Sequence, residues 1–167
     1  MATQDNLQAA FAGESQANRK YLAFAAQAEA ENLPNIAKLF RAAAAAETVH
    51  AHAHLRAMGG IGDTMKNLQT AIDGEGHEFR EMYPAFIQMA EAEGNQAALI
   101  SFRRANTVEE EHYNLFAAAK ESLQGGTDWA PAPIYVCDVC GHTHVGEAPD
   151  RCPVCGAAKI HFQPAGG

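Results

Sequence analysis

The amino-acid sequence predicts an all-α four-helix bundle followed by a small C-terminal module built around a metal ion. Two patterns carry this prediction. Apolar residues recur at helical spacing in four segments of residues 1–123, whereas all four cysteines lie within residues 137–155. The composition agrees with a helical fold, because 35 of the 167 residues are alanine and only 8% are aromatic, which argues against an all-β fold.

The predicted helices are separated by residues that end helices. Their apolar stripes cover residues 7–28, 36–57, 68–89 and 98–123. The proline-containing segment Asn32–Asn35 follows the first stripe, glycines at Gly59–Gly62 end the second, and Gly94–Asn95 ends the third. Pro84 lies inside the third stripe, where proline removes a backbone donor, so we expect a kink near Tyr83. Four amphipathic helices joined by short turns predict a bundle.

Acidic residues and histidines occupy stripe positions where a bundle core would otherwise place apolar residues. They are Glu14, Glu47, His50, Glu75, Glu78, Glu109 and His112. An uncompensated buried carboxylate costs several kcal/mol, and the same stripes carry no lysine or arginine. Bound cations are the simplest source of the compensating charge.

The spacing of these residues indicates one dinuclear metal site. Glu47 with His50 and Glu109 with His112 are i, i+3 pairs, whose side chains point from one helix face toward the same place. The halves of the helical region repeat the arrangement: Glu47 follows Glu14 by 33 positions, and Glu109 follows Glu75 by 34 positions. A glutamate from each of two helices, with Glu-x-x-His from the other two, is the dinuclear carboxylate pattern. Its oxygen and imidazole donors suit iron or manganese.

Three further side chains are expected beside this site. Glu78 is one carboxylate more than the minimal six-ligand set, and it either binds a metal or accepts a hydrogen bond from a ligand. Tyr21 and Tyr83 lie two turns beyond Glu14 and Glu75. Each tyrosine either packs in the core or donates a hydrogen bond to a ligand or a bound oxygen species.

Two matching Cys-x-x-Cys-Gly segments predict a second metal site, with Cys137, Cys140, Cys152 and Cys155 as its ligands. Gly141 and Gly156 permit the positive φ that turns backbone N–H groups toward the sulfurs. Four thiolates in a tetrahedral set fit zinc or a mononuclear iron, and the spacing alone does not choose between them. The glycines and prolines of residues 124–134 suit a linker, so we expect a helical domain at 1–123 and a metal-stapled module at 135–167.

The overall charge excludes some partners. Twelve basic and 20 acidic residues leave a net charge of −8, which argues against a nucleic acid or an anionic membrane surface as a partner. The sequence has no apolar run long enough to span a bilayer and no signal-peptide pattern at its start. We therefore expect a soluble, cytoplasmic protein.

These motifs together resemble the rubrerythrin family over essentially the whole length of the chain. The matching segments are Phe11–Tyr21, Glu47–His50, Glu75–Glu78, Met82–Pro84, Glu109–His112 and the two cysteine segments. The resemblance implies a ferritin-like bundle with a di-iron site, joined to a small rubredoxin-like β module with one iron. It also implies a peroxidase that reduces hydrogen peroxide to water in oxidative-stress defence. Asp138 stands where many rubredoxin-type segments have proline, and we expect little effect from it.

The resemblance also implies roles for individual residues and partners. Two iron ions would bind the seven residues Glu14, Glu47, His50, Glu75, Glu78, Glu109 and His112, while a third iron, or zinc, would bind the four cysteines. His50 and Glu78 would exchange as ligands of one iron when the site changes oxidation state. The partners would be an external electron-donor reductase and a second copy of the chain. In that homodimer, one subunit's rubredoxin-like module would lie near the other subunit's di-iron site.

Two other functions remain open at this point. A ferroxidase or iron-storage protein would use the same bundle but would need no electron-returning module. A structural or interaction protein would carry a zinc ribbon on a helical scaffold, although the core glutamates argue against it. Sustained peroxide turnover with reductant distinguishes the peroxidase from the first alternative, and the red colour of cysteine-ligated Fe³⁺ distinguishes it from the second.

Overall fold

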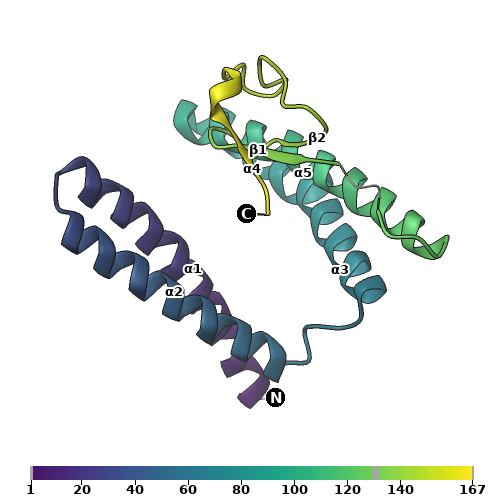
Figure 1. The fold of residues 1–167 in the computed structure, drawn as a ribbon, viewed down its shortest axis with the longest axis horizontal. Helices are drawn as coiled ribbons and strands as arrows, with labels where there is room; N and C mark the ends of the chain where they lie inside the picture. The colour runs from purple at the N-terminus through teal and green to yellow at the C-terminus, as the bar shows by residue number, and fades with distance from the viewer. Residues whose placement is uncertain (1, 130–131, 167) are drawn as a thin grey trace. The chain divides into compact units, whose positions relative to one another are not determined.

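The computed structural model describes residues 2–129 and 132–166. Its helices are α1 (Ala2–Ala30), α2 (Pro34–Ala57), α3 (Thr64–His77), α4 (Tyr83–Glu93) and α5 (Gln96–Gln124), with a π-helical turn at Glu78–Met82. Its strands are β1 (Ile134–Cys137), β2 (Thr143–Val145) and β3 (Phe162–Pro164), and a 3₁₀ turn covers Lys159–His161. The predicted fold class is confirmed, because α3, the π turn and α4 together form the third of four predicted helices (Figure 1).

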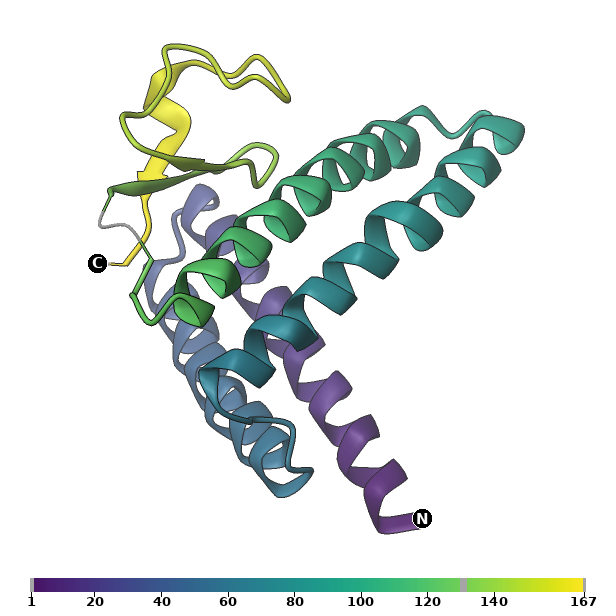
Figure 2. The same ribbon diagram turned by 90° about the vertical axis from the view of Figure 1, so that its right-hand side faces the viewer.

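The chain divides into two compact units, Met1–Gly62 and Asp63–Gly167. The first unit is a helical hairpin of α1 and α2, which we call the first hairpin. The second unit contains a hairpin in which α3, the π turn and α4 pack along α5, which we call the second hairpin (Figure 2). The second unit also contains the strands, and we call residues 132–166 the cysteine module.

Small side chains hold the first hairpin together. Ala25, Ala28 and Ala37 are buried at the contact between α1 and α2, and Phe40 packs against them. Such small residues let two helix backbones approach closely. The turn between the helices passes through Asn32, whose φ of 60° lies in the left-handed region that asparagine tolerates.

The ends of the helices in the second hairpin are capped by their own side chains. Asp63 accepts a hydrogen bond from the backbone N–H of Lys66 at 2.8 Å, and Asn95 accepts one from Ala98 at 3.1 Å. Gly94 ends α4 in the left-handed conformation, with a φ of 68°. These residues occupy the breaks that the sequence predicts, which explains why α4 and α5 end and begin where they do.

The irregularity expected near Tyr83 takes the form of the π-helical turn. The N–H of Tyr83 donates to the carbonyl of Glu78, five residues earlier, instead of the usual four. Pro84 follows directly and has no N–H to donate, so it is placed in the first turn of α4. Helical structure therefore continues from α3 through the π turn into α4, with the proline in the first turn of α4.

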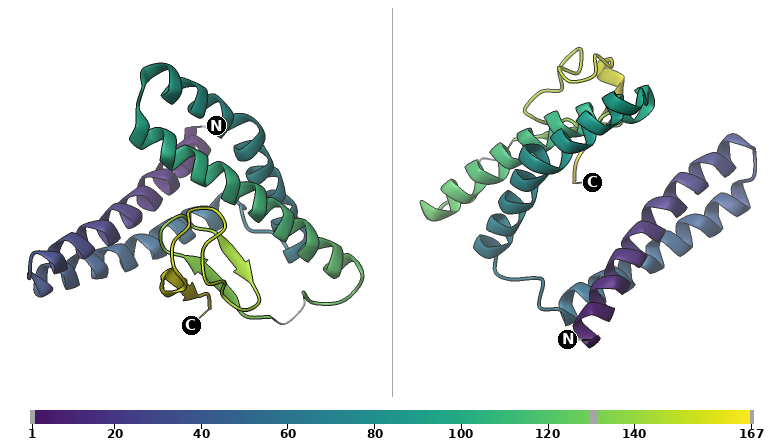
Figure 3. Two further views of the ribbon diagram at one scale, coloured as in Figure 1. Left: turned by 90° about the horizontal axis from the view of Figure 1, so that it is seen from above. Right: turned by 180° about the vertical axis from the view of Figure 1, so that it is seen from behind.

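The cysteine module is a three-stranded antiparallel sheet in the order β2-β1-β3 (Figure 3). Its small core consists of Cys137, Cys152, Ala148 and Phe162. Two of these four residues are candidate metal ligands, so a bound metal lies within the core that holds the module together.

In the described part of the chain, none of the helices is long and apolar enough to cross a lipid bilayer.

A buried polar side chain joins the two helices of the first hairpin. Asn18 is only 6% exposed, and its amide nitrogen donates to the Ala44 carbonyl at 2.7 Å and to the Thr48 hydroxyl at 2.8 Å. Arg19 donates to the amide oxygen of Asn18 at 2.9 Å. All the hydrogen-bonding groups of this side chain are thereby engaged, so it contributes both packing and polar contacts between α1 and α2.

Replacing Asn18 with alanine should lower the free energy of unfolding by about 1–3 kcal/mol, because buried hydrogen bonds are lost and a cavity forms. Urea denaturation followed by helical circular dichroism measures the change. Gln27→Ala is the matched control, since Gln27 is exposed on the same helix and should change stability by less than about 0.5 kcal/mol. Equal stability of the two variants would contradict the assignment.

Candidate metal centres

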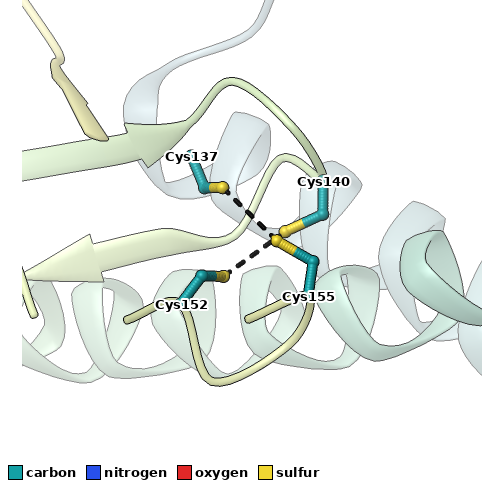
Figure 4. Close-up of side chains that lie close together, drawn as sticks. All are labelled: Cys137, Cys140, Cys152 and Cys155. Atoms are coloured by element: carbon teal, nitrogen blue, oxygen red, sulfur yellow. Dashed lines mark hydrogen bonds between the residues drawn. The ribbon is translucent and has the colours of Figure 1, made fainter. Parts of the chain in front are cut away.

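The four cysteine sulfurs converge at one point in the cysteine module (Figure 4). The sulfur of Cys137 lies 3.7 Å from that of Cys155, and the sulfurs of Cys140 and Cys152 are 3.5 Å apart. A tetrahedral ion with metal–sulfur bonds of about 2.3 Å would place its sulfurs about 3.8 Å apart. All four cysteines are free thiols, so the cluster has the size and donor atoms that a tetrahedral metal ion requires.

The backbone around these cysteines repeats the same turn twice. The N–H of Gly141 donates to the Cys137 carbonyl at 2.8 Å, and that of Gly156 donates to the Cys152 carbonyl at 2.8 Å. The two glycines have φ values of 85° and 77°, as the sequence predicts. Burial is the largest cause that raises the pKa of the Cys140 thiol, which disfavours the thiolate in the absence of a cation. A bound metal ion would reverse that preference.

The first hairpin brings three of the predicted ligands together. Ligand atoms of Glu14 on α1 and of Glu47 and His50 on α2 lie within 4.8 Å of one another, and we call this set the first cluster. Nδ1 of His50 is 2.8 Å from Oε2 of Glu47. The His50 side chain is 56% exposed.

The second hairpin brings together the equivalent set. Ligand atoms of Glu75 on α3 and of Glu109 and His112 on α5 also lie within 4.8 Å of one another, and we call this set the second cluster. Nδ1 of His112 is 2.7 Å from Oε2 of Glu109. Each cluster thus offers two carboxylates and one imidazole. That both clusters share one dinuclear site stays a prediction.

The charges of the second cluster favour a bound cation. Burial, followed by the charge of Glu109, raises the pKa of Glu75 to about 7. The same two causes raise the pKa of Glu78. A raised carboxyl pKa means that the ionised form is disfavoured where it stands, and a nearby metal ion would stabilise it. The residues present therefore fit a divalent metal ion in charge as well as in donor type.

The π turn explains the one-residue difference between the two halves of the helical region. From Glu14 to Tyr21 is seven residues, whereas from Glu75 to Tyr83 is eight. The extra residue lies in the π turn, whose first residue is Glu78. Glu78 lies outside the 4.8 Å set of the second cluster, yet the charge of Glu109 still raises its pKa. The corresponding position of the first hairpin holds Ala17, so the additional carboxylate belongs to the second hairpin alone.

The two predicted tyrosines lie in matching aromatic groups but differ in their electrostatic surroundings. The Tyr21 ring is 6.2 Å from that of Phe40, and the Tyr83 ring is 6.2 Å from that of Phe102. Burial and then the charges of Glu78, Glu109 and Glu75 raise the pKa of Tyr83, so its phenol stays protonated beside the second cluster. The position of Tyr21 is set by packing of its ring against Phe24 and Phe40.

Two contacts that the sequence does not predict join α5 to the cysteine module. Nε2 of His112 lies 2.9 Å from the hydroxyl of Thr143, and Nδ1 of His142 lies 2.5 Å from Oε2 of Glu111. No helical or strand periodicity indicates these pairs. The only sequence signal is a run of polar residues after the first cysteine turn, His142–His144, in a module whose helical partner cannot be identified from the sequence.

Comparison with known proteins agrees with both metal centres. A family model described as rubrerythrin matches residues 5–120, and one for the rubrerythrin rubredoxin-like domain matches residues 135–163. The chain is 36% identical to rubrerythrin-2 of Clostridium acetobutylicum, over 96% of this chain and 95% of that protein. It is 34% identical to nigerythrin of Nitratidesulfovibrio vulgaris, over 96% and 85%. A solved structure of partially reduced nigerythrin matches with a TM-score of 0.58 at 34% identity, covering 97% of this chain and 86% of that one.

A family model that spans most of the helical region, together with relatives at this identity over nearly the whole chain, is sufficient evidence of descent. The chain belongs to the rubrerythrin family of oxidoreductases.

Proposed function

We propose that this protein is a non-haem di-iron peroxidase that reduces hydrogen peroxide to water in oxidative-stress defence. Electrons would come from an external reductase through a mononuclear iron in the cysteine module. The observation that carries the proposal is the 2.9 Å contact between His112 of the second cluster and Thr143 of the cysteine module. A structural zinc ribbon does not require contact with a metal ligand of the helices. An electron carrier, in contrast, must lie close to the metal centre that it reduces.

Three parts of the chain would divide the reaction between them. The carboxylates and imidazoles of the two clusters would hold two iron ions, which when bound supply one electron each and act as Lewis acids. The raised pKa of Glu75 indicates that its ionised form needs a cation beside it, which an iron ion would supply. Tyr83 keeps its phenolic proton and can donate a hydrogen bond toward the same carboxylates.

The two histidines are held differently, which supports the exchange of His50 and Glu78 that the family resemblance implies. Both ring nitrogens of His112 have partners, Glu109 and Thr143. Among the described residues, His50 has a partner at Nδ1 alone, and most of its side chain is exposed. His50 is therefore freer to rotate away from a metal, and Glu78 is a carboxylate of the second hairpin that lies outside the second cluster.

The remaining partners are part of the same proposal. A homodimer and a cytoplasmic location would suit an enzyme that meets a diffusing peroxide and a separate reductase. The acidic net charge of −8 also disfavours nucleic acid as a ligand.

Replacing Glu109 with alanine should lower kcat/KM for hydrogen peroxide by at least about 100-fold, because a charged metal ligand is lost. Steady-state assays with an artificial reductant measure this. Glu110→Ala is the control, since Glu110 is the exposed neighbour on the same helix and should keep the activity. Unchanged turnover in both variants would refute the proposal, and stoichiometric Fe²⁺ oxidation with mineral accumulation would favour a ferroxidase instead.

Replacing Cys152 with serine should abolish the red colour of the iron-loaded protein and disorder the cysteine module, since the metal lies in its core. Visible absorption, metal analysis and amide hydrogen exchange of residues 134–164 give the three readouts. Glu147→Ala, at an exposed position of the same module, should leave all three unchanged. If the native protein proves colourless with one zinc per chain, the electron-relay part of the proposal is wrong.

A further inference from the structure

The cysteine module lies against α5 of its own chain through three neighbouring contacts. Glu111 pairs with His142, whose side chain is 8% exposed. His112 pairs with Thr143. The backbone of Gly141 covers Val108, which is 3% exposed, and a side chain added at Gly141 would meet Val108 at 3.8 Å. Two of these contacts are polar and the third is close packing of backbone on Val108. Together they fix the position of the module along α5.

The contact between His112 and Thr143 continues as a hydrogen bond to the backbone next to a cysteine ligand. Nδ1 of His112 faces Glu109 on the metal side, so a neutral ring that binds metal through Nδ1 carries its proton on Nε2. Nε2–H then donates to the Thr143 hydroxyl, and that hydroxyl donates to the Gly141 carbonyl at 3.4 Å. Gly141 is bonded directly to Cys140. Thr143 is therefore the one side chain between the ring of His112 and the backbone that carries a cysteine ligand.

We propose that Thr143 positions the His112 ring and bridges the two metal centres, so that electrons pass from the cysteine module to the second cluster within one chain. The inference rests on the proposed peroxidase function and adds its route. It differs from the family expectation in which a module serves the other subunit. Each hydrogen peroxide takes up two electrons and two protons and gives two waters. When the cysteine-bound iron gives up one electron, it is oxidised from Fe²⁺ to Fe³⁺. The external reductase then reduces it again by one electron.

Two variants separate the hydroxyl of Thr143 from its shape. Thr143→Val removes the hydroxyl at nearly constant volume, and Thr143→Ser keeps it. In protein loaded with zinc at all sites, the Nε2–H proton of His112 should give a slowly exchanging nuclear magnetic resonance signal in the native and serine forms and not in the valine form. A signal that persists unchanged in Thr143→Val would refute the positioning role.

Rapid mixing tests the electron route with the same variants loaded with iron. When fully reduced protein meets hydrogen peroxide, the cysteine-bound iron should regain its red colour about 10-fold more slowly in Thr143→Val than in native protein or Thr143→Ser. The ferric absorption spectrum and reduction potential of the cysteine-bound iron should stay the same in all three. Equal rates would overturn the inference. Failure of the proposed peroxidase function would give a different result: hydrogen peroxide would not reoxidise even the native protein.

Mixed assemblies test whether the route lies within one chain. Chains carrying Cys152→Ser and chains carrying Glu109→Ala, distinguished by two affinity tags, are co-expressed and the mixed species is isolated. A route within one chain predicts no peroxide turnover, because each chain lacks one end of it. A route between chains predicts about half the native activity.

The reciprocal mixture provides the control. Native chains are paired with chains that carry both Cys152→Ser and Glu109→Ala. A route within one chain now predicts about half the native activity, and a route between chains predicts none. Activity in the first mixture together with none in the second would overturn the inference.

Discussion

Half-buried carboxylates without a strong basic partner are the constraint on which the helical part of this protein depends. In the described chain, none of the glutamates of the two clusters pairs with lysine or arginine, and the ring nitrogens of two histidines are the groups that contact Glu47 and Glu109. The pKa of Glu75, raised to about 7, shows the consequence: the ionised form is disfavoured where it stands. Bound metal ions would relieve that cost, so binding metal at the clusters would also stabilise the helices that carry them.

The π turn adapts the third helix to this requirement. A regular α-helix through Pro84 would lose a hydrogen bond and clash with the preceding turn. Inserting one residue resolves the clash, and it also sets the helical phase of Tyr83 relative to Glu75. The same insertion places Glu78 at the start of the π turn, in the hairpin that carries one carboxylate more than its counterpart. A local backbone irregularity and a difference of residue type at one position thus together distinguish two otherwise matching hairpins.

The contact between α5 and the cysteine module makes the two histidines unequal. His112 is held at both ring nitrogens, whereas His50 is held at one and is largely exposed. A ring fixed on both sides keeps its orientation through a change of metal charge. The asymmetry arises because the cysteine module contacts His112, whereas among the described residues His50 has a partner at Nδ1 alone.

Helix boundaries, the Glu-x-x-His pairs and the cysteine pairs were determined by the sequence itself, because periodicity, capping residues and turn residues act within a few positions. The sequence also shows the spacings of 33 and 34 positions between paired glutamates. The reason for the one-residue difference is the π turn, which only the structure shows. Only the tertiary structure decided that Thr143 meets His112 and that His142 meets Glu111, each 31 residues apart. Such pairs depend on how a sheet edge packs on a helix, and packing between distant segments leaves no periodic trace in the chain.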